Sequence, residues 1–304
     1  MSLLVVGSVA YDGIKTPRGE VDRVLGGAGA YIALAACHFT KVRLVAVVGD
    51  DFSDDDEAVL QRHNIDLEGL QRVPGKSFYW KGVYSRRMNH RRTIVTELGV
   101  FADFQPRLPA SYRSTPHILL GNIHPDLQNL VLDQTPNREF AAGDTMNYWI
   151  ERTPEQLAST VRRWDSILIN DEEALQLTGL DSLVAAARAI LATGPSTVVI
   201  KRGEHGATLF RAGECFMAPA YPLERLIDPT GAGDAFAGGF MGYLASRGYR
   251  NAGECRSIDL RRAMIYGSVM GGLCCEGFGV DALKELTRES IDQRFNEFRN
   301  LTSY

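Results

Sequence analysis

The chain has 304 residues, of which 45% are hydrophobic and 23% are charged, and its formal net charge is −4. This length and apolar content are sufficient to bury a large core, and we expect a single main α/β domain over residues 1–304. A slightly acidic chain without a basic block argues against a nucleic-acid partner and favours a small-molecule substrate.

Cysteine usage and hydropathy suggest a compartment. The chain has five cysteines: Cys37, Cys215, Cys255, Cys274 and Cys275. Their number is odd and no pair has Cys-x-x-Cys spacing, which favours a reducing environment. The apolar run at residues 3–6 is short for a signal peptide, and no 18-residue apolar stretch occurs. We therefore expect a cytoplasmic protein without a membrane partner.

The first apolar segment predicts a ligand-binding edge. Residues 3–9 (LLVVGSV) are typical of a buried strand, and residues 10–17 are expected to turn away from its carboxyl end. Open α/β sheets bind their ligands at such ends. Asp12 is the polar residue there, and it either contacts a ligand or stabilises the turn.

A small-residue helix and a second strand are predicted next. Residues 25–38 include Gly26 and Gly27, which permit close approach of the backbone to a ligand before the helix continues. Residues 42–49 predict a second buried strand, and an acidic helix is expected over residues 54–63.

Residues 76–104 change to the alternating pattern of a β-hairpin, with a turn at residues 86–90. The hairpin is rich in aromatic residues: Phe78, Tyr79, Trp80 and Tyr84. We expect an inserted lid that excludes water from a substrate, with parts of residues 10–20 as candidates for its remainder. Asn89 in the turn is a candidate substrate contact. A surface hairpin that mediates dimerisation is the alternative.

Three further apolar segments predict parallel strands that end in polar residues. Residues 117–121 and 140–144 are two of them, and Asp144 and Asn147 follow the second, either lining a pocket or forming a turn.

The third of these strands covers residues 166–170 and leads into a helix. Asn170 and Glu173 stand at the junction, three residues apart. An amide and a carboxylate at this spacing suit a hydrated Mg²⁺ ion, which prefers oxygen ligands. A capping arrangement at the helix start is the alternative.

The most informative stretch is LIDPTGAGDAFAGGFMG, residues 226–242. After a strand-like approach, Gly231, Ala232 and Gly233 can direct successive backbone N–H groups into one concavity, where the positive end of a following helix favours an anion. Asp234 would repel that anion unless it accepts a proton from an attacking hydroxyl, as phosphoryl transfer to an alcohol requires. The alternative is that Asp234 only caps the helix.

This stretch resembles the C-terminal motif of the ribokinase-like (PfkB) carbohydrate and nucleoside kinases at Asp228, Thr230, Gly231, Ala232, Gly233, Asp234, Phe236, Gly239 and Phe240. The chain has no G-x-x-x-x-G-K-[ST] loop, no protein-kinase H-R-D set and no dinucleotide fingerprint. The resemblance continues from the first strand to Gly279. It implies an α/β fold, a three-layer α/β/α sandwich with a mostly parallel central sheet and a small β lid.

The resemblance also implies roles on the nucleotide side. The turn from Gly231 to Gly233 would be the anion hole and Asp234 the base. Residues 197–209 resemble the family's strand-turn-strand beside ATP. The nucleotide contacts implied or inferred in this way are Lys201, Gly203, Gly206, Thr230, Ser268, Gly271 and Gly277. Lys201 departs from the family's frequent threonine and is a candidate phosphate contact.

On the acceptor side, the resemblance implies that Asp12 bonds sugar hydroxyls beside Gly26 and Gly27. Tyr31 stands where the family often has asparagine, which suggests a larger or differently hydroxylated acceptor, unless Tyr31 belongs to the core. Asn170 and Glu173 match the family's Asn-x-x-Glu motif. The implied cofactors are ATP, Mg²⁺ and a monovalent cation such as K⁺, and pairing of lids between subunits would give a homodimer.

We therefore expect an ATP-dependent kinase that phosphorylates a hydroxyl of a sugar, with a nucleoside or a cyclitol such as inositol as the alternative acceptor. A rival from another class is a sugar- or nucleotide-binding module without catalysis, but retention of Asp234 argues against it. A Rossmann oxidoreductase is a distant third, because its fingerprint is missing.

Overall fold

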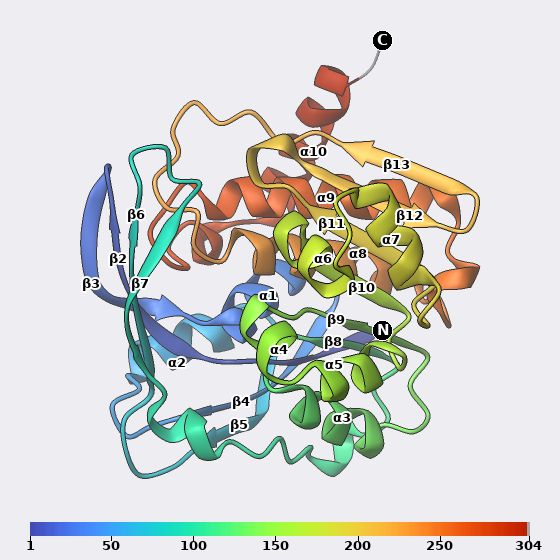
Figure 1. Ribbon diagram of the computed structural model, residues 1–304. Helices are drawn as coiled ribbons and strands as arrows, with labels where there is room; N and C mark the ends of the chain where they lie inside the picture. The colour runs from blue at the N-terminus through green and yellow to red at the C-terminus, as the bar shows by residue number, and fades with distance from the viewer. Residues whose placement is uncertain (303–304) are drawn as a thin grey trace.

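The computed structural model describes residues 1–302 and consists of three layers, with helices covering both faces of a large sheet (Figure 1). The large sheet has the order β13-β12-β11-β10-β9-β8-β1-β4-β5. Its strands are β1 (Ser2–Val6), β4 (Lys41–Val48), β5 (Ile65–Arg72), β8 (His117–Leu120), β9 (Phe140–Gly143), β10 (Ser166–Asn170), β11 (Thr197–Lys201), β12 (Ala207–Arg211) and β13 (Glu214–Ala218). All neighbours from β5 to β11 pair in parallel, and β12 and β13 are antiparallel.

Two apolar clusters hold the layers together. Alternate residues of β1 point to opposite faces, so that Leu3 packs in one cluster and Leu4 in the other. Parallel strands covered by helices on both faces are apolar along their whole length, which explains the continuous runs that identify them in the sequence.

Ten helices surround the sheet within residues 1–302: α1 (Ala28–Ala36), α2 (Asp54–Gln61), α3 (Pro125–Gln134), α4 (Asn147–Arg152), α5 (Pro154–Val161), α6 (Asp171–Thr178), α7 (Leu183–Leu191), α8 (Ala232–Arg247), α9 (Ser257–Cys274) and α10 (Arg288–Thr302). Helices α1, α8 and α9 share the first cluster, whereas α3, α5 and α7 belong to the second. Short 3₁₀ turns include η3 (Gly203–His205) and η5 (Leu283–Glu285).

A second, four-stranded sheet stands beside the large one in the order β3-β2-β6-β7 (Figure 1). Its strands are β2 (Ala10–Thr16), β3 (Gly19–Gly26), β6 (Phe78–Tyr84) and β7 (Arg91–Glu97). Strand β2 pairs in parallel with β6, which joins two segments far apart in the sequence. We call this the small sheet.

The fold expected from the sequence is confirmed, with local corrections. Residues 10–17 do not simply turn away, because most of them form strand β2. The helix expected over residues 25–38 begins only at Ala28, since Gly26 ends β3 and Gly27 has a φ of 88°. The approach to Asp228 is a loop rather than a strand.

Among residues 1–302, no single helix combines the length and the apolar character needed to cross a membrane, although α6 and α7, bent by 63°, meet those two criteria as a pair.

Candidate active site

The glycine turn and Asp234 lie at the start of α8. Gly231 is the N-cap residue, with a left-handed φ of 74°, and it makes no side-chain cap. A Cβ at Gly231 would lie 2.4 Å from the ring of Tyr31, so both backbone conformation and space require glycine. Asp234 therefore does not cap the helix, and its carboxyl group stands in the first turn, where helix N–H groups and the dipole favour negative charge.

Asp228 fixes the loop before this turn. Its side chain is fully buried, and it accepts hydrogen bonds from the backbone N–H groups of Thr230 at 2.9 Å and Gly279 at 3.1 Å. Burial outweighs these bonds and raises the pKa of Asp228. The loop is thereby tied to the segment after α9, which holds the glycine turn in one conformation.

The carboxyl ends of β9, β10 and β11 bring charged groups to the same edge of the sheet. Lys201 ends β11, and its Nζ lies 2.9 Å from Oδ2 of Asp144, which follows β9. Both side chains are largely buried, at 15% and 9% exposed. A Cβ at Gly233 would lie 3.3 Å from Nζ of Lys201, so this cation stands directly beside the glycine turn.

Electrostatics link this ion pair to two further acids. Burial and the charge of Asp144 raise the pKa of Asp234 to about 7, although Lys201 opposes the shift. Asp234 is partly exposed by surface area, yet its carboxyl group is densely surrounded by protein. Burial and Asp144 also raise the pKa of Glu173 to about 7. Burial disfavours the charge of Lys201, but the carboxylates around it prevail and raise its pKa.

Asn170 and Glu173 form the capping arrangement that the sequence offered as an alternative. Oδ1 of Asn170 accepts the N–H of Glu173 at 2.7 Å, and Oε2 of Glu173 accepts the N–H of Asn170 at 2.9 Å. Asn170 ends β10 in register with Lys201 on β11. The two residues thus combine a cap for α6 with a position beside the ion pair.

The acceptor-side residues lie where β2, β3 and α1 meet. Asp12 is 4% exposed and accepts a hydrogen bond from the hydroxyl of Tyr31 at 3.1 Å. Burial raises the pKa of Asp12 to about 7, and the Tyr31 bond opposes that shift. The Tyr31 ring is 1% exposed, so it belongs to the core and connects Asp12 to Gly231. A Cβ at Gly26 would strike Asp12, which explains this glycine.

The small sheet reaches the glycine turn through Tyr84. Its hydroxyl lies 2.9 Å from Oγ1 of Thr230. The charge of Arg91, at the start of β7, opposes the rise in the pKa of Asp234. Asn89 is exposed in the turn between β6 and β7.

The other aromatic residues of the hairpin have partners of their own. Phe78 stacks on Phe101 with ring centroids 5.4 Å apart, and the hydroxyl of Tyr79 donates to the carbonyl of Asp22. The Trp80 ring lies under Arg91. Of the four aromatic residues of the hairpin, Tyr84 is therefore the one that bonds directly to Thr230, the residue before the glycine turn.

Packing accounts for several glycines expected at the nucleotide. Gly206 has a φ of 82°, and a Cβ there would strike the backbone of Ala218. A Cβ at Gly271 on α9 would lie 3.1 Å from the carbonyl of Ala232, and one at Gly277 would lie 2.9 Å from the N of Ala282.

The two remaining nucleotide candidates are also placed. Ser268 is buried in α9, whereas Gly203 is exposed in η3 with open space around it.

Sequence reasoning did not pair Asp144 with Lys201 or bring Arg91 to Asp234. The sequence does contain a pattern that indicates the first pair, because residues of opposite charge stand at the carboxyl ends of two strands of one parallel sheet. No local pattern indicates the second contact, since Arg91 begins strand β7 of the small sheet and the glycine turn begins helix α8.

Two comparisons of sequence place the chain among known proteins. Residues 2–286 match the model of the pfkB family of carbohydrate kinases. The cytidine kinase of Thermococcus kodakarensis is 33% identical over 271 residues, which covers 86% of this chain and 95% of that relative.

Solved structures show the same fold. The nucleoside kinase of Burkholderia thailandensis in complex with inosine has a TM-score of 0.77 at 22% identity, covering 98% of both chains. A ribokinase II of E. coli, described as putative and bound to ATP and Mg²⁺, has a TM-score of 0.80 at 18% identity, covering 97% of this chain and 99% of that one. Because the family model spans nearly the whole sequence, this protein belongs to the pfkB family of carbohydrate kinases and is a phosphotransferase that acts on a hydroxyl group.

Proposed function

We propose that this protein transfers the γ-phosphoryl group of ATP to a sugar hydroxyl, with a nucleoside as the preferred acceptor. The observation that carries the proposal is the position of Asp234 in the first turn of α8, behind a glycine turn and beside the buried cation of Lys201. A proton acceptor and an anion cradle at one point are what transfer to an alcohol requires.

In the proposed reaction, Asp234 accepts the proton of the acceptor hydroxyl while the oxygen of that hydroxyl bonds to the γ-phosphorus. The bond from that phosphorus to the bridging oxygen breaks, and ADP leaves. Backbone N–H groups of residues 231–233 and the ammonium of Lys201 stabilise the charge on the transferred group. Asp144 positions Lys201 through their 2.9 Å ion pair.

The surroundings fit a divalent cation. The charge of Asp144 acts on both Glu173 and Asp234, and Lys201 and Arg91 oppose it, so three carboxyl groups stand beside two cations there. Asn170 and Glu173 would hold Mg²⁺ through its water shell, and the ion would offset phosphate charge when bound.

We propose that the small sheet is the lid of this site. The bond from Tyr84 to Thr230 supports this role, because it connects the sheet to the residue before the glycine turn. A closed lid excludes water, which competes with the alcohol for the phosphoryl group. Replacement Tyr84→Phe should raise acceptor-independent ATP hydrolysis relative to transfer, whereas the matched change Tyr79→Phe, within the sheet, should leave the ratio unchanged.

Two observations favour a nucleoside over a free sugar. The relative at 33% identity is named a cytidine kinase, and a structural neighbour binds inosine. A free sugar remains the second candidate, because the family is described by carbohydrates and a ribokinase II shares the fold.

The test is an ADP-release screen with ATP and Mg²⁺ across pyrimidine and purine nucleosides, ribose, deoxyribose, fructose and inositol, with products identified by mass. Asp234→Asn serves as the catalytic control. Acceptor-dependent ADP release with a phosphorylated nucleoside supports the proposal. A phosphorylated free sugar alone overturns the acceptor, and binding without any phosphorylated product makes the protein a binding module.

A further inference from the structure

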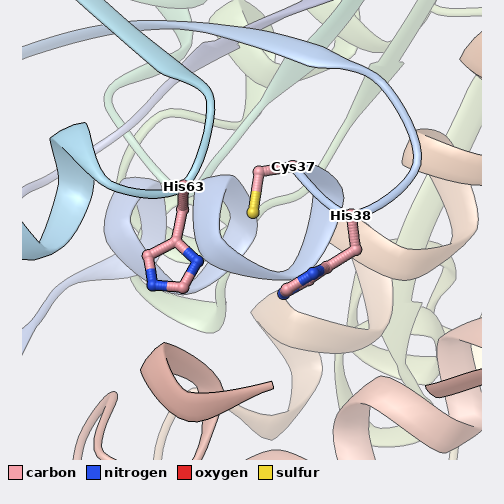
Figure 2. A group of neighbouring side chains, drawn as sticks. All are labelled: Cys37, His38 and His63. Carbon is pink, nitrogen blue, oxygen red and sulfur yellow. The ribbon is translucent and has the colours of Figure 1, made fainter. Parts of the chain in front are cut away.

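A second cluster of chemically reactive side chains lies away from the proposed active site. Cys37 and His38 follow the last turn of α1, and His63 lies in the segment between α2 and β5. One ligand atom of each residue lies within 4.8 Å of the others. Figure 2 shows the thiol of Cys37 between the two imidazole rings.

The thiol of Cys37 donates to the carbonyl of Leu34 at 3.1 Å, and zinc binding would displace that proton. Nε2 of His38 is buried and has no hydrogen-bond partner within residues 1–302, although buried polar atoms are nearly always paired. The ring of His63 faces the backbone carbonyl of Lys284, a partner that can fix one nitrogen as a donor and leave the other as an acceptor. Metal-binding histidines typically have such a carbonyl partner behind them.

The donor set selects the class of metal. One thiol and two imidazoles suit a borderline-soft ion, whereas Mg²⁺ and Ca²⁺ prefer oxygen. We propose that Cys37, His38 and His63 bind one Zn²⁺ ion, with water as the fourth ligand.

The geometry needs only a small adjustment. Ligand atoms around tetrahedral zinc lie roughly 3.3–3.7 Å apart, so the present separations must close by about 1 Å, which side-chain rotations can supply. The C-terminal end of α1 favours a cation. The charges of Arg288 and Arg62 oppose one, and Glu285 and the thiolate formed on binding offset them.

The ion would join three segments of the chain. It would tie the end of α1 to the α2–β5 segment, and through the Lys284 carbonyl to η5. Tyr31 lies six residues before Cys37 on α1, about 9 Å along the helix axis. The proposed ion is therefore a structural clamp on the helix that carries an acceptor-side residue, and it takes no part in phosphoryl transfer.

The test uses the full-length protein freed of metal by a chelator and kept reduced. Zn²⁺ binding is measured by calorimetry in excess Mg²⁺, and Co²⁺ serves as a spectroscopic probe because a thiolate ligand gives a charge-transfer band. We expect one equivalent of Zn²⁺, a thiolate–cobalt band and a rise in Tm on adding zinc.

The variants Cys37→Ser and His63→Asn change different segments, and each should weaken zinc binding at least ~10²-fold and remove the rise in Tm. Cys215→Ser and His90→Asn are matched controls at exposed positions and should bind as the wild type does. Circular dichroism identifies a variant that fails to fold, in which case the other variant decides. Any of three results would overturn the proposal: binding of far less than one equivalent of Zn²⁺, a cobalt spectrum without the thiolate band, or unchanged zinc binding in a folded variant.

Discussion

The phosphate side and the acceptor side of the proposed active site are built differently. On the phosphate side, Lys201 forms a buried ion pair with Asp144 beside the glycine turn. On the acceptor side, Asp12 accepts a hydrogen bond from the neutral hydroxyl of Tyr31. Charged groups therefore lie where phosphate would bind, and hydrogen-bonding groups lie where a sugar would bind. This difference shows why the reaction is easier to infer than its substrate.

The largest expected effect is on the phosphate side. Asp234→Asn retains the shape of the side chain and the amide cradle but removes the proposed base. We expect kcat to fall by ~10²–10⁴-fold, the usual contribution of general-base catalysis. Steady-state kinetics with the acceptor found in the screen measure it. Retention of more than about a tenth of wild-type kcat would remove Asp234 from this role.

The next effect tests Lys201 without leaving a buried charge unpaired. The double variant Lys201→Met/Asp144→Asn is compared with the wild type, because either single change would leave a lone buried partner and destabilise the fold. We expect kcat/KM for ATP to be roughly 10²-fold lower in the double variant than in the wild type, as for loss of one transition-state donor. Equal values would show that the cation does not act on the phosphates.

A pH profile sharpens the comparison further. The pKa of Asp234 is raised to about 7, and a base must be deprotonated to act. As the pH falls below 7, kcat/KM for the acceptor should therefore drop about tenfold per unit. The pKa values of Asp12 and Glu173 are also about 7, so the profiles of Asp12→Asn and Glu173→Gln identify the group. Loss of the acidic limb in Asp12→Asn would assign it to the acceptor side.

The smallest effect belongs to the acceptor side. Tyr31→Phe removes the 3.1 Å hydrogen bond to Asp12 but keeps the ring against Gly231. We expect acceptor KM to rise by roughly tenfold or less, with kcat nearly unchanged. Tyr79→Phe is the matched control. A fall in kcat without a change in KM would place Tyr31 in the transfer chemistry instead.

The same division explains how far the sequence could predict the molecule. Strands such as β1 and β10 are continuous apolar runs, and the glycine turn with Asp234 is one contiguous motif, so both were predictable. Strand β3 was missed because most of its residues are at least partly exposed, and its polar and charged positions show no regular alternation.

Long-range contacts were the other limit. The pairing of β2 with β6 joins residues about seventy positions apart, and the Asp144–Lys201 pair spans 57. The zinc-binding cluster proposed above brings Cys37 and His63 together without any metal-binding spacing. None of these contacts has a local pattern, because each depends on which strands and loops become neighbours.

In the proposed site, the base and the phosphate cradle are separate parts, so they should contribute differently to ATP affinity. ATP binding is measured by calorimetry for the wild type, Asp234→Asn and Lys201→Met/Asp144→Asn. We predict that Asp234→Asn binds ATP within about threefold of the wild type or more tightly, whereas the double variant binds at least ~10-fold more weakly. If Asp234→Asn lost as much ATP affinity as the double variant does, the base and the cradle would not be separate parts.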